Sequence, residues 1–118
     1  MKVNQPVHLL KQELIKVYNS VNQEMYSIGV SSQRIEFLGD KIIIFAIHKR
    51  IPALRVLDEE YDVLTSMIDS VLIKKNKQQL AERLQTVIEV PIRTILKDYD
   101  PHTELTVTVI VLEDVLEF

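Results

Sequence analysis

Apolar residues recur every three or four positions near the start of the chain, which places them on one side of an α-helix. They are Val7, Leu10, Leu14, Val17, Val21, Met25 and Ile28. Pro6 suits the first helical turn, where its missing N–H is not needed, and Gly29 suits the C-terminal cap. The pattern therefore predicts a helix over residues 7–28.

Two segments with strand-like patterns follow, separated by Gly39 and Asp40. The first, residues 34–38, alternates apolar and polar positions, as a half-buried strand does. The second, residues 41–48, is apolar on both faces, with Ile42, Ile44 and Ala46 on one and Ile43, Phe45 and Ile47 on the other. The Gly-Asp pair predicts a tight turn with glycine at positive φ, so the two segments are expected to form a β-hairpin.

Two more helices are expected in the middle of the chain. Asp58 is the expected N-cap of the first, whose apolar stripe is Leu57, Tyr61, Leu64, Ile68 and Val71. The polar run 74–77 interrupts this pattern, and Asn76 with Gln79 resembles a capping box for the second. That helix is expected to carry Leu80, Leu84, Val87, Ile88, Ile92 and Ile95. Pro91 lies within it, which predicts a kink near Val87 or a break at Val90.

The last third of the chain predicts a second hairpin. A short strand over residues 97–100 precedes the turn-forming Asp100-Pro101 pair, and a longer strand covers residues 105–112. Together these elements predict one α+β domain over residues 1–118. Its order is α-β-β-α-α-β-β, with the helices layered on one face of an antiparallel sheet of two hairpins.

The composition removes several kinds of function. The chain has no cysteine, only two glycines and three histidines. It therefore has no thiolate chemistry and no glycine-rich phosphate loop, and we expect no enzyme activity, metal or cofactor. The net charge of −3 argues against nucleic acid as a partner. The longest apolar run, residues 42–47, is far too short to insert into a membrane, and no secretory signal is seen, so a cytoplasmic location is expected.

Two charged clusters have more than one interpretation. His48, Lys49, Arg50 and Arg55 could bind a small anion or an acidic partner, or they could be a solvated strand end whose charges discourage edge pairing. Asp98, Asp100 and His102 could contribute to a cation site or to an active site. The plainer interpretation is that these acids bond to the backbone of their own turn.

The two-sided strand over residues 41–48 is the most unusual feature. Three helices on one face of the sheet would leave the other face apolar, which a monomer rarely does. We therefore expect an oligomer interface, most simply in a homodimer, formed by Ile43, Phe45, Ile47, Ile110 and Leu112. The alternative is that the helix containing Pro91 wraps round to cover this face.

Three stretches together carry a resemblance to a known family: residues 34–44, residues 48–54, and Asp98-Tyr99-Asp100-Pro101 with the strand 105–112. They resemble the MpsC-like family of small bacterial proteins, a domain of unknown function. The resemblance implies an accessory role, with a membrane-complex partner protein, in a sodium-translocating, membrane-potential-generating system linked to bicarbonate supply. It implies no catalytic residues. Many relatives have a proline and an acid just after the second strand, whereas here the acids begin at Asp58.

Overall fold

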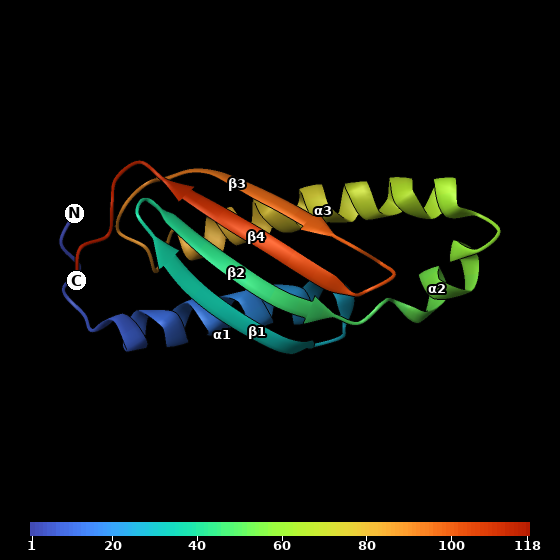
Figure 1. Cartoon of the computed structure of the whole chain (residues 1–118), viewed down its shortest axis with the longest axis horizontal. Helices are drawn as coiled ribbons and strands as arrows, with labels where there is room; N and C mark the ends of the chain where they lie inside the picture. The colour runs from blue at the N-terminus through green and yellow to red at the C-terminus, as the bar shows by residue number, and fades with distance from the viewer.

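Three helices and four strands make up the structure, a computed structural model that describes residues 1–118. The elements are α1 (Val7–Tyr26), β1 (Val30–Leu38), β2 (Lys41–His48), α2 (Pro52–Asp58), α3 (Asp62–Leu84), β3 (Ile92–Tyr99) and β4 (Leu105–Leu112). The strands form one antiparallel sheet in the order β1-β2-β4-β3, and α1 and α3 lie side by side across one of its faces (Figure 1). The predicted α+β class and the order α-β-β-α-α-β-β are confirmed.

The first hairpin forms as its sequence predicts. Leu38 pairs with Lys41, so the loop has two residues, and Gly39 has the positive φ of 58° that a tight turn of this kind needs. The strand β2 then pairs with β4, which places both β2 and β4 in the middle of the sheet. A central strand has its backbone N–H and C=O groups paired along both edges.

The core lies between the helices and one face of the sheet, which we call the inner face. In β2, Ile42, Ile44 and Ala46 point into it, as the alternation predicts. The core cluster comprises Leu10, Leu14, Tyr18, Val21, Ile35, Ile42, Ile44, Ala46, Leu80, Leu84, Ile88, Val90, Ile95, Ile110 and Leu112. Burying these side chains is the main stabilising contribution, because each removes apolar surface from water.

The end of α1 differs from the prediction. Ser27, not Gly29, takes the left-handed conformation, with φ of 57°, and its N–H donates to the carbonyl oxygen of Gln23. The helix therefore stops at Tyr26, and Ile28 belongs to the connection that leads into β1.

The middle helices also differ. Asp58 is the last residue of the short α2 instead of a cap, and one helix, α3, then runs through the polar segment 74–77 without a break. Lysine is a good helix former, so the polar run does not interrupt α3. The predicted stripe is wrong as well: Tyr61, Leu64 and Val71 are exposed, and the side of α3 that turns inward begins with Thr65.

The segment around Pro91 contains a break instead of a kink. The helix α3 ends at Leu84, and Ile92 and Ile95 belong to the strand β3. The side chain of Gln85 holds the loop by donating to the carbonyl oxygens of Ile88 and Val90 and accepting from the N–H of Ile92. Proline lacks an N–H, and the residues after it favour strands. These residues therefore pair with β4 and do not continue the helix.

The face of the sheet away from the helices, which we call the open face, has no cover. Its apolar side chains are Leu38, Ile43, Phe45, Ile47, Leu96, Leu105, Val107, Val109 and Val111. The expected interface residues Ile110 and Leu112 are not among them: both lie in the core, because β4 turns its mixed face, with Thr106 and Thr108, toward the helices. The prediction was wrong for these two residues and right in placing Ile43, Phe45 and Ile47 on the uncovered face.

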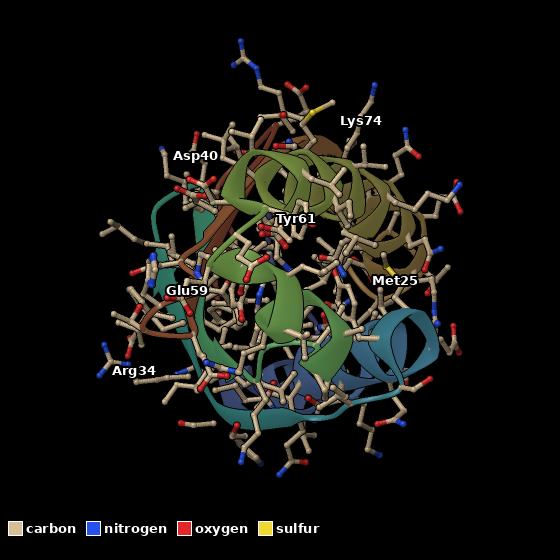
Figure 2. The ribbon with its side chains drawn as sticks, turned by 90° about the vertical axis from the view of Figure 1, so that its right-hand side faces the viewer. Met25, Arg34, Asp40, Glu59, Tyr61 and Lys74 are labelled. Atoms are coloured by element: carbon tan, nitrogen blue, oxygen red, sulfur yellow. The ribbon has the colours of Figure 1, made fainter.

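The molecule is elongated, with extents of 51 × 23 × 21 Å. The N- and C-terminal segments meet at one end, where Lys2 and Glu117 form a parallel bridge (Figure 1). At the other end, α2 and the first half of α3 extend past the sheet as an arm. Seen from the arm, Arg34 points away from the helical layer, Lys74 points outward from α3, and Met25 lies between α1 and α3 (Figure 2). None of the helices has the length and apolar character needed to cross a membrane.

Candidate functional site

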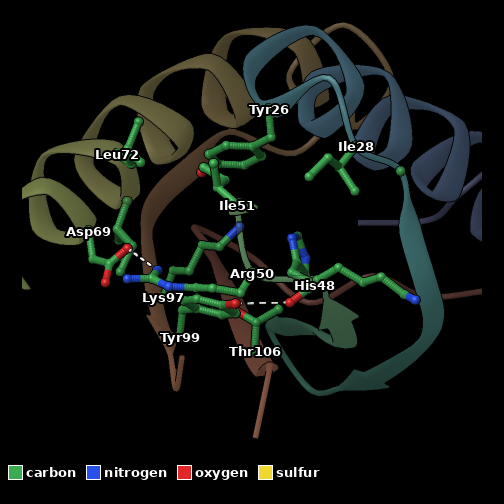
Figure 3. A pocket seen from close by; sticks show the side chains of 13 residues that line it. Tyr26, Ile28, His48, Arg50, Ile51, Asp69, Leu72, Lys97, Tyr99 and Thr106 are labelled. Carbon is green, nitrogen blue, oxygen red and sulfur yellow. Dashed lines mark hydrogen bonds and ion pairs between the residues drawn. The ribbon is translucent and has the colours of Figure 1, made fainter. Parts of the chain in front are cut away.

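A small cavity lies where the arm joins the sheet. It is lined by the end of α1, the first half of α3, the last residue of β2 with the segment 49–51 that follows it, and residues of β3 and β4. Its volume of about 50 Å³ accommodates a few water molecules or one small ligand. Figure 3 shows His48, Arg50 and Lys97 reaching this space from the sheet side, with Tyr26 and Ile28 across from them.

Arg50 forms the most heavily bonded group in the cavity wall. Its side chain is only 2 % exposed. Its Nε and Nη2 donate to the two carboxylate oxygens of Asp58 at 2.9 and 2.7 Å, and its Nη1 donates to Asp69 at 2.6 Å. Bonds of this charge-assisted kind hold the pKa of Asp58 below its ordinary value. The guanidinium thereby ties the end of β2 to both α2 and α3.

His48 is a half-buried, uncharged side chain in the cavity wall. Its Nε2 lies 2.6 Å from the hydroxyl oxygen of Tyr18, and its backbone carbonyl oxygen accepts from the hydroxyl of Tyr99 at 2.9 Å. Burial lowers the pKa of His48 to about 4 and raises the pKa of Tyr18 above its ordinary value. At neutral pH the imidazole is therefore uncharged, and it shares one hydrogen bond with the tyrosine hydroxyl.

Lys97 is the basic group inside the cavity that has no carboxylate partner, whereas Lys49, also without one, is exposed at the rim. Its Nζ donates to Oδ1 of Asn76 at 2.5 Å and lies 5.2 Å from the centre of the Tyr18 ring. Asn76 in turn donates to Asn22, whose side chain donates to the backbone carbonyl oxygen of Tyr18. Burial lowers the pKa of Lys97 to about 7. No opposite charge offsets this cost, in contrast to Arg50.

The predicted basic cluster does not gather around one point. His48 faces Tyr18, Arg50 is saturated by two aspartates, and Arg55 lies on α2 and pairs with Glu104 at 3.0 Å. Lys49 is exposed at the rim of the cavity. Three of the four residues line the cavity, and Arg55 does not.

In the predicted acidic cluster, Asp100 stabilises the turn in which it lies. Asp100 accepts from the N–H of His102 and from the hydroxyl of Thr103, as an aspartate before proline commonly does. Asp98 and His102 are exposed, and Asp98 lies on the open face. Across the chain, no group of three or more histidine, aspartate or glutamate side chains is arranged to hold a metal ion.

Sequence reasoning missed the two residues that make this site unusual, Lys97 and Asn76. Asn76 was expected to cap a helix, and Lys97 was expected to begin a short strand. A signal for Lys97 is present: once Ile95 is placed in a strand facing the core, strict alternation puts Lys97 on the same side. The inward position of Asn76 follows from the unbroken helix, since it lies one turn before the buried Leu80.

Comparisons with known proteins found no match for this chain. The chain matches no family model, no curated protein and no solved structure. The resemblance to the MpsC-like family therefore stays a prediction from the residues.

Proposed function

We propose that the protein is a non-enzymatic interaction domain that forms a homodimer through the open face of its sheet. The observation that carries the proposal is the continuous run of apolar side chains over the two central strands, which includes Phe45, 41 % exposed, and Leu105, 56 % exposed. A contiguous apolar surface of this kind on a small protein marks an interaction site.

The charges at the edges of the open face favour a second copy of the chain as the partner. Arg34 on edge strand β1 pairs with Phe45, which pairs with Val107, which pairs with Asp98 on edge strand β3. All four side chains are therefore at one level of the sheet, with opposite charges at its two edges. A two-fold axis parallel to the strands would place Arg34 of each copy against Asp98 of the other.

The mass of the protein in solution tests this proposal. We expect the wild type to sediment as a dimer and F45E to sediment as a folded monomer, because burying a carboxylate among the apolar side chains of the interface carries a desolvation cost. The matched control is V71E, which adds the same charge at a position 68 % exposed on α3 and should remain dimeric. A monomeric wild type, or a dimer that V71E dissociates and F45E does not, would contradict the proposal.

The cellular role follows from the resemblance alone. We propose that the dimer is a cytoplasmic accessory subunit of a membrane ion or bicarbonate system. Wild-type protein used as bait on detergent-solubilised membranes should retain a transport protein. Recovery of no such partner, with the bait folded and dimeric, would count against the membrane role and leave the dimer proposal standing.

A further inference from the structure

The cavity beside the arm has the features of a binding site for a small anion. Lys97 contributes an ammonium group with three N–H donors, of which only one is committed, to Asn76. Of the other basic side chains that line this space, Arg50 is already paired with Asp58 and Asp69, His48 is uncharged at neutral pH, and Lys49 is exposed at the rim. Lys97 is thus the group whose charge a ligand would balance, and a buried charge gains most from such a partner because it is poorly solvated.

The size and lining of the cavity narrow the class of anion. A space of about 50 Å³ fits a molecule of only a few non-hydrogen atoms. Ile28, Ile51 and Leu72 give the wall an apolar part, which suits an alkyl group better than a second charged oxygen. Inorganic phosphate, with a larger charge and no apolar end, would leave several oxygens without donors.

We propose that this cavity binds a short-chain monocarboxylate, with the carboxylate paired to Lys97 and the alkyl end against the apolar wall. The site is separate from the open face, so the proposal is independent of dimer formation. Lys97 here acts as a binding residue, and Asn76 positions its ammonium group.

Titration of the full-length protein with sodium acetate and sodium propionate, followed by amide chemical shifts, tests the site. We expect saturable shifts at cavity residues, with affinity at least about tenfold weaker in K97M. The control K75M removes an exposed lysine from the outer side of α3 and should bind like the wild type. Because K97M exchanges a half-buried unpaired charge for an apolar side chain of similar length, it is expected to fold, and K97Q provides a second variant if it does not.

The pH dependence of acetate binding gives a second, independent readout. Acetate stays ionised between about pH 6 and 9, so any change of affinity in this range reports a group on the protein. The charged and titratable groups around Lys97 are Tyr18 and Tyr26 from α1, Asp69 from α3, His48, Lys49 and Arg50 at the end of β2, and Tyr99 from β3. The pKa of His48 is about 4 and that of Tyr26 about 12, both outside the range.

Affinity is therefore expected to fall about tenfold per pH unit above about pH 7, where Lys97 loses its proton. Three outcomes would overturn the proposal: no saturable shift up to about 100 mM acetate, binding that K97M leaves unchanged, or tighter binding of inorganic phosphate than of acetate.

Discussion

At the scale of single residues, Arg50 connects several parts of the fold through its backbone and its side chain. Its backbone N–H donates to Glu104 in the turn between β3 and β4, and its side chain bonds to α2 and α3. The helices α2 and α3 and the turn between β3 and β4 are thus joined at one buried cation. Such a residue cannot be identified from a basic cluster alone, because Arg50 and Arg55 look equivalent in the sequence and differ only in what surrounds them.

Replacing Arg50 tests this difference. We expect R50M to lower the free energy of unfolding by about 3–5 kcal/mol, because Asp58 and Asp69 would lose their buried counter-charge. The matched variant R55M removes an arginine whose side chain is 58 % exposed and should cost less than about 1 kcal/mol. Urea denaturation at neutral pH measures both. Equal effects for the two variants would show that the ion cluster is not the tether inferred from its geometry.

At the scale of elements, α1, β1, β2 and β4 were predictable because a single periodicity governs each of them. In β2 the alternation separated Ile42, Ile44 and Ala46 from the uncovered side chains correctly. It could not say which face the helices cover in β4, because both faces of that strand are rich in apolar residues. Only the end of β3 was predicted, as the short strand over residues 97–100. Its first residues, Ile92 to Ile95, were assigned to a helix because they follow directly on a helical pattern, and the pairing that makes them a strand comes from β4.

The long helix α3 shows a different limit. Its inward side mixes polar residues, such as Thr65 and Asn76, with apolar ones, such as Leu72 and Leu80. Hydrophobicity alone therefore does not mark the side of the helix that faces the protein. The outward Met67 and Val71 belong to the arm, where there is no sheet beneath the helix to cover. Which residues of α3 are buried therefore depends on where the helix lies against the sheet. For this reason the periodicity of the sequence could not predict the candidate site around Asn76.

The cap of α1 gives a prediction at this scale. Ser27 adopts a left-handed conformation that costs a residue with a Cβ free energy and that glycine adopts freely. We expect S27G to raise the free energy of unfolding by about 0.5–1 kcal/mol. The control Q12G, at an exposed position inside the same helix, should lower it by about 1 kcal/mol. Thermal unfolding followed by circular dichroism distinguishes the two, and a destabilised S27G would show that the hydroxyl matters more than the backbone.

At the scale of the whole molecule, the two copies of the proposed homodimer contact each other through the open face. If the two-fold axis is parallel to the strands, R34E and D98R should each weaken the dimer, since each places like charges together across the interface. The double variant restores opposite charges and should recover most of the lost affinity. Sedimentation equilibrium of the four proteins gives the dissociation constants. Additive losses in the double variant would exclude this axis.

The meeting of the two chain ends at one end of the molecule has a practical consequence. An affinity tag or a fluorophore attached at Met1 or Phe118 would project from the pole opposite α2, remote from the cavity. A two-fold axis along the strands keeps like poles together, so labels on both copies would lie close enough for energy transfer. Immobilising the protein through such a tag would then leave the opposite end, with the arm and the opening of the cavity, accessible to ligands in solution.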